Sequence, residues 1–246
     1  MHNIMNRRDF VKICTTTATA VVTTPEVLAQ PDAAHVLVER VRLVDSEGAP
    51  MTTASLEAGE AYLFFFPHVT TPCFLIDLGR PVTTKQTLRT KNSVSYVWPG
   101  GVGRNQSIVS FSAICAHRMT HPAPEVSFIS YRHGKVEVTG KDYDVQSHTG
   151  VIYCCSEGSV YDPARGGHVL GGPAPQPLAT ILLDYDSTQD TLSAYGVLGG
   201  NMFEPYFKKF WHRLELSFGV RNVRAQAHGT TRVIKASDFS ASQVMC

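Results

Sequence analysis

Residues 107–117 read Ser-Ile-Val-Ser-Phe-Ser-Ala-Ile-Cys-Ala-His, an apolar run that ends in a Cys-x-His pair. A run of this length that is rich in Val, Ile and Phe predicts a β-strand. Cys115 and His117 therefore follow directly on a strand, and their thiol and imidazole can face one site. A single Cys-x-His pair is weak evidence for a metal site, so its meaning depends on the rest of the chain.

Similar short runs recur on both sides of this stretch and are separated by Gly, Pro and Asn. Their spacing predicts an all-β fold, an antiparallel sandwich or small barrel, over residues 35–200. A segment rich in polar residues, 81–103, is expected to be a long connection between strands. The other predicted strands are 61–66, 73–78, 135–139, 151–155 and 180–185.

The pattern changes after Gly200, where aromatic residues and Leu recur at spacings of three and four with basic residues between them. This predicts an amphipathic helix over residues 201–218. We expect the helix to pack on the core of the domain, and docking of a partner subunit is the alternative. Residues 219–246 are polar and are expected to form a mobile tail.

Residues 1–30 have the parts of an export signal. Arg7 and Arg8 are followed by Phe10, by a modestly apolar stretch and by small residues near Ala29. The paired arginines resemble the twin-arginine motif, which implies export of a folded protein to the periplasm. The apolar stretch is short for a membrane span, although an uncleaved signal could act as an anchor.

The chain has 246 residues, 43% of them apolar and 17% charged, and a formal net charge of +1. It is long enough for one domain with a sizeable core, and its composition is not that of a disordered protein. The charges form no long single-sign runs, so no nucleic-acid partner is expected. No nucleophile elbow, phosphate loop or pair of catalytic carboxylates is evident, so we assign no catalytic residue.

A second cysteine loop gives the Cys-x-His pair its meaning. Residues 154–162 read Cys-Cys-Ser-Glu-Gly-Ser-Val-Tyr-Asp, and residues 171–175 read Gly-Gly-Pro-Ala-Pro. With Cys115 and His117, they resemble the two cluster-binding loops of Rieske iron–sulfur proteins. In that family each loop supplies one Cys and one His to a [2Fe-2S] cluster.

By this resemblance the loops span about 113–122 and 152–175 and form a small cluster-binding subdomain on the β base. The resemblance also includes the strands of this chain that precede the first loop, which are similar to the corresponding strands in the small subunits of arsenite oxidases. It covers roughly residues 56–199.

The match is incomplete at one ligand position. Cys115, His117 and Cys154 fall on three of the four positions, but Glu157 stands where the family has its second histidine. Glu157 is our first candidate for the fourth ligand, because iron accepts oxygen as well as nitrogen and sulfur. A site that is empty, or that holds a single metal such as zinc, is a further alternative. The other candidates for the fourth ligand are His121, which would keep two imidazoles, and Cys155, which would give three thiolates.

The resemblance also implies roles for residues that are not ligands. The hydroxyls of Ser159 and Tyr161 would donate hydrogen bonds to sulfur and raise the reduction potential, whereas a Glu157 ligand would lower it. Gly172 and Pro173 belong to a segment that would cover the cluster.

Many family members join the two loops by a disulfide, and the matching positions here are Thr120 and Ser156, so we expect a protein without a disulfide. We expect no ligand role for His133, His148, His168 and Cys73.

The function that the resemblance implies is a single-electron relay, a redox subunit more than an enzyme by itself, which serves a partner protein or a larger oxidoreductase. Two other functions stay open. One is a β domain that has lost its cluster and acts as a binding or assembly module through its helix. The other is the Rieske subunit of a quinol-oxidising cytochrome bc-type complex.

Overall fold

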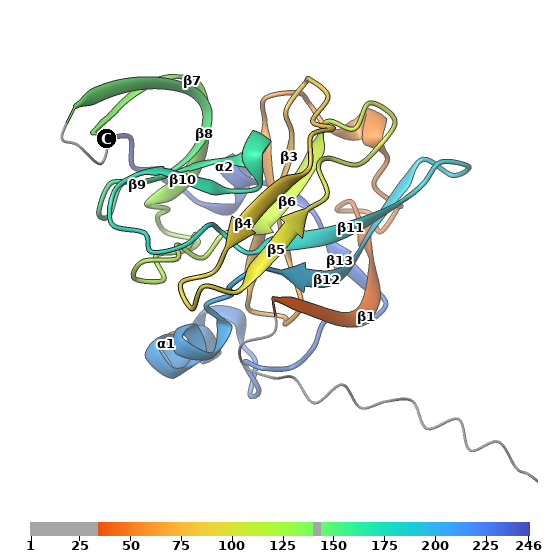
Figure 1. The fold of residues 1–246 in the computed structure, drawn as a ribbon. Coiled ribbons are helices and arrows are strands. Elements are labelled where there is room, and N and C mark those ends of the chain that lie inside the picture. The colour runs from red at the N-terminus through yellow and green to blue at the C-terminus, as the bar shows by residue number, and fades with distance from the viewer. Residues whose placement is uncertain (1–33, 140–143) are drawn as a thin grey trace, which may run out of the picture. The chain divides into compact units, whose positions relative to one another are not determined.

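The largest element of the fold is a sheet of eight strands, with the order β13-β1-β12-β11-β6-β3-β2-β14 (Figure 1). The computed structural model describes residues 34–139 and 144–246, so the expected export signal lies outside the described residues. The strands are β1 (His35–Val44), β2 (Ala61–Phe65), β3 (Pro72–Asp77), β6 (Ile108–Ser112), β11 (Thr180–Asp186), β12 (Thr191–Leu198), β13 (Thr230–Arg232) and β14 (Ile234–Lys235).

This sheet is nearly closed. Strands β13 and β14 are consecutive in the chain but stand at opposite ends of the strand order, because β13 pairs with β1 and β14 pairs with β2. The hydroxyl of Thr231 donates to the Phe65 carbonyl at 3.0 Å, which ties the two ends together. Most neighbouring strands are antiparallel, and the all-β prediction is confirmed.

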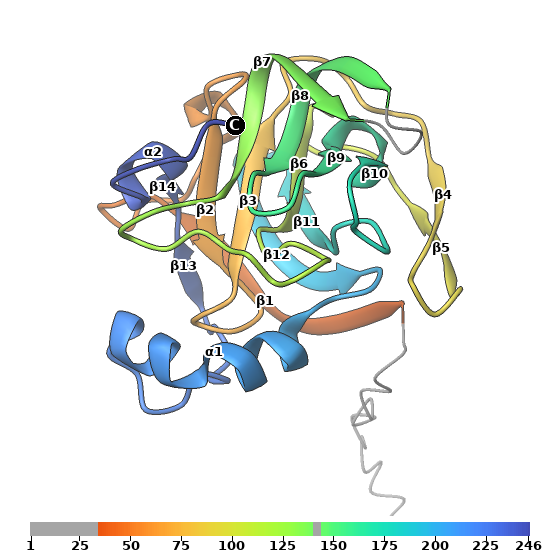
Figure 2. The same cartoon turned by 90° about the vertical axis from the view of Figure 1, so that its left-hand side faces the viewer.

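A second sheet carries the order β10-β9-β8-β7 and is antiparallel throughout (Figure 2). Its strands are β7 (Ile129–Thr139), β8 (Val145–Cys154), β9 (Ser159–Asp162) and β10 (His168–Gly171). The apolar strand β6 of the large sheet leads to Cys115, and β8 of the second sheet ends at Cys154. The two cysteine loops therefore come from different sheets.

The segment 81–103 is not only a connection, as the sequence suggested. It contains a hairpin of β4 (Gln86–Arg89) and β5 (Ser95–Trp98), in which Leu88, Tyr96 and Trp98 are buried. Every second residue of β5 faces the core, which is the pattern of a half-buried strand. Four-residue strands give too few alternations to be recognised among Pro, Gly and Lys.

The predicted helix is confirmed as α1 (Phe203–Phe218), and it packs on the core of its own domain through four buried residues, Phe203, Tyr206, Phe207 and Leu214. No helix of the described residues has the length and apolar character that a membrane crossing requires. The remaining helical elements are η1 (Thr53–Ser55), η2 (Pro163–Arg165) and α2 (Ala236–Phe239).

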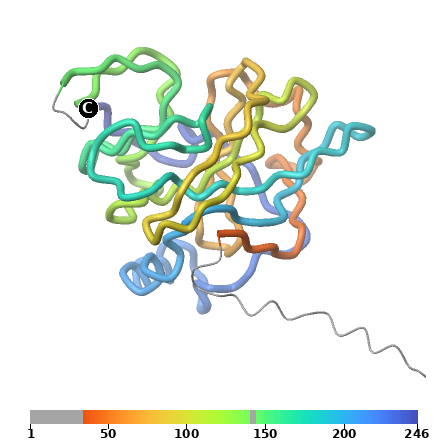
Figure 3. The backbone as a smooth tube through the Cα atoms, in the orientation of Figure 1, coloured from red at the N-terminus to blue at the C-terminus, as the bar shows by residue number. Residues whose placement is uncertain are grey.

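The expectation of a mobile tail after residue 219 is wrong. This segment supplies β13, β14 and α2, and the chain then ends beside the β7–β8 hairpin (Figure 3). Backbone N–H and C=O groups pair in a sheet whatever side chains they carry. A polar composition therefore did not reveal that the segment is ordered.

Candidate functional site

The first cysteine loop is a tight turn that closes on itself. The backbone N–H of Cys115 donates to the Thr120 carbonyl at 2.8 Å, and the N–H of Met119 donates to the Cys115 carbonyl at 3.0 Å. Met119 takes a left-handed conformation with φ of 63° to complete the turn. The backbone of Cys115 is thus fixed on both sides, and its side chain is 2% exposed.

The second cysteine loop is the turn of the β8–β9 hairpin. Cys154 and Ser159 are paired across the hairpin, and the N–H of Gly158 donates to the Cys154 carbonyl at 2.9 Å. Gly158 has a φ of 73°, which glycine adopts without the steric cost that other residues meet. Cys154, 1% exposed, is held at the end of the strand as firmly as Cys115 is.

Cys115 and Cys154 are free, buried thiols whose side chains interact. The interaction with Cys154 lowers the pKa of Cys115, with further help from Tyr161 and from the backbone of His117, although burial acts in the opposite direction. The same interaction and burial raise the pKa of Cys154, while the Thr120 side chain acts to lower it. The pair therefore favours a thiolate at Cys115, which is the form that binds metals.

Tyr161 contacts the Cys115 sulfur from the side of the second loop. Its hydroxyl lies 3.2 Å from Cys115 Sγ and accepts a hydrogen bond from the Ala116 N–H at 3.1 Å. Burial and the nearby Cys115 raise the pKa of this phenol, so it keeps its proton and can donate it to sulfur. The role of Tyr161 as a donor that raises the reduction potential of a cluster stays a prediction.

His117 and Glu157 form a second pair. Glu157 Oε2 lies 3.0 Å from His117 Nδ1, and Glu157 Oε1 lies 3.0 Å from Arg118 Nε. The contact with Nδ1 is close, but it is not aligned as a hydrogen bond, so this buried nitrogen has no hydrogen-bond partner in the described chain. The carboxylate thus reaches from the second loop to the imidazole of the first.

The hydroxyl of Ser159 is also buried without a hydrogen-bond partner among the described residues, and Ser159 is 0% exposed. Leaving a buried polar group unsatisfied costs about 1–3 kcal/mol. Ser159 Oγ and His117 Nδ1, one from each loop, are therefore the two atoms of the site that a bound group could satisfy.

Gly172 shows why a glycine is needed where the third segment meets the second loop. A Cβ at this position would lie 2.2 Å from the Gly158 carbonyl oxygen and 2.6 Å from Ser159 Cα, and the φ of Gly172 is 78°. The backbone of the segment 171–175 therefore lies directly against the turn that carries Glu157 and Ser159. Pro173 is exposed, and its role as a cover stays a prediction.

The candidate donors of the two loops are arranged in two pairs. Within 34–139 and 144–246, no three His, Cys, Asp or Glu side chains gather around one point. One pair is Cys115 with Cys154, and the other is His117 with Glu157. A Rieske-type cluster takes two thiolates on one iron and two imidazoles on the other, so the thiol pair fits the first iron and Glu157 departs from the family at the second.

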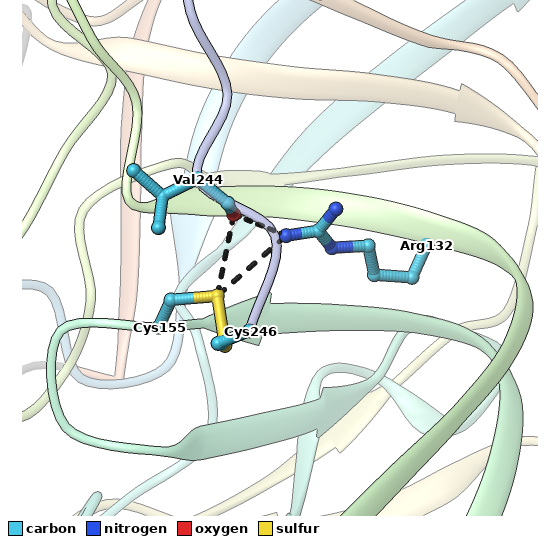
Figure 4. Close-up of a disulfide and its surroundings, with 4 residues drawn as sticks. All are labelled: Arg132, Cys155, Val244 and Cys246. Carbon is cyan, nitrogen blue, oxygen red and sulfur yellow. Dashed lines mark hydrogen bonds between the residues drawn. A yellow bond between two sulfur atoms is a disulfide. The ribbon is translucent and has the colours of Figure 1, made fainter.

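Cys155 is not available as a ligand, because it forms a disulfide with Cys246 (Figure 4). This corrects two expectations, the alternative of three thiolates and the absence of any disulfide. The two cysteines are 91 residues apart in sequence, and one of them lies in the segment that was expected to be a mobile tail. No local sequence pattern links the two cysteines, so the disulfide became evident only from the place of the chain end in the fold.

The structure places His121 against α1. Its Nδ1–H donates to the Met119 carbonyl at 2.9 Å, and its ring meets Tyr206 and Phe210 edge-on, with 4.8 Å between ring centroids in each case.

Cys73 is fully buried in β3, where it donates to the Phe66 carbonyl at 3.0 Å and where burial raises the pKa of its thiol.

The sequence did not identify Thr120 as part of the site. Its side chain acts to lower the pKa of Cys154, and its carbonyl accepts a hydrogen bond from the N–H of Cys115. The only signal for Thr120 in the sequence was its register with a cysteine of the related loops.

Three histidines were expected to lack a ligand role. His133 lies on β7 beside Gly59, His148 lies on β8 and His168 lies on β10.

Two partly buried histidines under α1 should make the protein less stable in mild acid. Burial lowers the pKa of His121 to about 4, and the pKa of His68, whose ring contacts Phe207, also to about 4. As pH falls from about 6.5 towards 4, the unfolded chain takes up these protons before the folded chain does. The free energy of unfolding should therefore fall by a few kcal/mol across this window, as measured by urea titration.

The variant His121→Gln removes one of the two titrating groups and keeps a donor for the Met119 carbonyl. It should reduce this pH dependence by roughly half. His212→Gln, on the exposed side of α1, should leave the dependence unchanged. Equal slopes in all three proteins would contradict the prediction.

Comparison of the chain with protein-family models finds no match. Among solved structures, the chain is similar to the soluble domain of the Rieske protein II (soxF) from Sulfolobus acidocaldarius. The two share 27% sequence identity, with a TM-score of 0.42, over 65% of this chain and 78% of that chain.

Proposed function

We propose that this chain is a Rieske-type electron-transfer protein that binds a [2Fe-2S] cluster between its two cysteine loops. The observation that carries the proposal is the pair of free, buried thiols Cys115 and Cys154, with the Tyr161 hydroxyl 3.2 Å from the Cys115 sulfur. These two thiols belong to loops from different sheets, and a second donor pair, His117 and Glu157, also joins the two loops. The loop sequences and their register with the family support the same function.

Cys115 and Cys154 would hold one iron, and His117 Nδ1 and the Glu157 carboxylate would hold the other. When bound, such a cluster accepts and gives one electron at a time. Tyr161 donates a hydrogen bond towards the Cys115 sulfur, and Ser159 offers a second hydroxyl at the loop. Donors of this kind stabilise the reduced state because they compensate added negative charge on sulfur.

The carboxylate sets this site apart from a two-histidine site. Glu157 brings a negative charge to the pair that would bind the reducible iron, although Arg118 at 3.0 Å compensates part of it. We expect a lower reduction potential than two imidazoles would give, because negative charge opposes the gain of an electron. The site would therefore suit an electron donor and an electron acceptor whose reduction potentials are lower than those of the partners of a two-histidine protein.

We also propose that the protein works outside the cytoplasm, after export by the twin-arginine route, and that it passes electrons to or from a partner oxidoreductase. The disulfide between Cys155 and Cys246 supports this location, because disulfides persist in oxidising compartments such as the periplasm. An uncleaved signal would add a membrane anchor. The similarity to arsenite oxidase small subunits makes a large redox enzyme our preferred class of partner.

The proposal is tested by electron paramagnetic resonance of the dithionite-reduced protein, purified without air, together with an iron and zinc count. We expect about two irons per chain and a rhombic signal of low average g. A sample without iron, or with zinc alone, would refute electron transfer and favour a binding module.

The same measurements on Glu157 variants test the fourth ligand. Glu157→Gln should lose at least about half of its iron, because a neutral amide binds iron more weakly than a carboxylate. Glu157→His should keep the iron and raise the potential by tens of millivolts, on the order of 1–2 kcal/mol for one electron. Glu204→Gln is the matched control. It removes an exposed carboxylate of α1 that pairs with Arg224, and it should change neither the iron content nor the reduction potential. Unchanged iron and spectra in both Glu157 variants would exclude this ligand.

A further inference from the structure

The last seven residues of the chain, 240–246, form what we name the C-terminal strap. One part of the strap lies along residues 123–127, which directly follow the first cysteine loop. The Ser240 hydroxyl donates to the Ala123 carbonyl at 2.8 Å, and the Ala241 N–H donates to the Pro124 carbonyl at 2.8 Å. These contacts fasten the strap to the chain that leaves the first loop.

The strap then continues as a short parallel pairing with the chain before β7. The N–H of Ser127 donates to the Ser242 carbonyl at 2.8 Å, and the N–H of Val244 donates to the Ser127 carbonyl at 2.9 Å. Because both the N–H and the carbonyl of Ser127 bond to the strap, the strap pairs with this segment in a single register.

The end of the strap reaches the second loop. The disulfide joins Cys246 to Cys155, the residue directly after Cys154 (Figure 4). Arg132 of β7 donates to the Val244 carbonyl, and its Nη2 lies 3.6 Å from Cys155 Sγ. Arg132 is 6% exposed, so a buried guanidinium holds the strap and the disulfide together.

We propose that the C-terminal strap is a bridge between the two cysteine loops and that it positions the second loop, and with it Cys154, against the first. As far as cluster binding is concerned, this inference rests on the proposed function. Residues 123–127 anchor one end of the strap, and Cys155 anchors the other. The bridge acts where Thr120 and Ser156 offer no direct disulfide between the loops. Cys155 and Cys246 are thus positioning residues that act through the backbone of Cys154.

The test compares amide hydrogen exchange in the wild type, in Cys246→Ser and in the control Met245→Ala, whose side chain is 71% exposed and leaves the disulfide intact. In Cys246→Ser the amides of Cys155 and Gly158 should exchange about tenfold faster. The amide of Ser112, which donates to Ala179 in the large sheet, should keep its rate within about twofold. Met245→Ala should match the wild type at all three amides.

A purely global effect of the disulfide on stability would speed up all amides together, and that result would overturn the proposal. So would unchanged exchange in the second loop, or alkylation of both Cys155 and Cys246 in the unreduced, denatured wild type. If Cys246→Ser does not fold, the wild type is treated in its folded state with a phosphine reductant, and the same amides should respond.

Iron release to a chelator gives the second readout. Cys246→Ser should lose iron about tenfold faster than Met245→Ala, because residues that orient metal ligands tune affinity by 10–100-fold, as an order-of-magnitude rule. If the wild type itself contains no iron, the proposed function fails. The exchange measurement still decides whether the strap positions the loop, so the two failures are distinguishable.

Discussion

Cys115→Ala should abolish cluster binding, with the iron content falling from about two per chain to near zero. Cys115 supplies the favoured thiolate of the pair, and Tyr161, the Ala116 amide and Cys154 are all arranged around it. An alanine leaves one thiol where two are needed, and no other free cysteine of the described chain lies in either loop. Metal analysis and the visible spectrum of the purified variant measure the effect.

The matched control for this variant is Cys73→Ala. Cys73 is as deeply buried as Cys115, but it lies in the core of the large sheet on strand β3. Its replacement should cost about 1 kcal/mol or somewhat more in the free energy of unfolding and leave the iron content unchanged. Full iron in Cys115→Ala, or equal loss in both variants, would show that the thiol pair does not hold the cluster.

The second large effect is expected for Gly172→Ala. The added Cβ would stand 2.2 Å from the Gly158 carbonyl oxygen, so the third segment must move away from the second loop. Together with the positive φ, this should lower the free energy of unfolding by about 3 kcal/mol or more. Because Glu157 and Ser159 flank Gly158, the displaced turn should also release iron. Urea unfolding and an iron count provide the two measurements.

Gly48→Ala separates backbone strain from steric overlap. Gly48 has a φ of 86°, similar to that of Gly172, but a Cβ there meets nothing within 4 Å. The substitution should therefore cost only about 1–2 kcal/mol, the strain of a left-handed alanine, and should leave the iron in place. If the two variants were equally stable, the close approach at Gly172 would have no energetic consequence.

The sequence predicted those parts of the fold and of the site that depend on near neighbours in the chain. Short β-branched runs between turn residues indicated strands, and aromatic residues at spacings of three and four indicated α1. These patterns are local because strand and helix geometry places the side chains of near neighbours on one face. In this way Cys115, three residues past the end of β6, and Cys154, the last residue of β8, could be placed next to strands.

Elements with short or polar sequences were not predicted correctly. The β4–β5 hairpin has only four residues in each strand, and β13 and β14 are shorter still. Their stability comes from the strands beside which they lie, so their own residues carry little signal. Polar backbone segments are ordered by hydrogen bonds to distant partners, as Ser127 is by the strap.

The order of residues along the chain indicates the all-β class, the helix near the C-terminus and the residue types that a two-loop metal site would use. The tertiary structure adds the contacts between distant segments: Cys115 interacts with Cys154, Glu157 meets His117, and His121 packs under α1. It also paired Cys155 with Cys246 across 91 residues. Strand and helix geometry repeats along the chain, so the resulting pattern of side chains can be recognised in the sequence. Contacts between distant segments depend on how all the strands pack together.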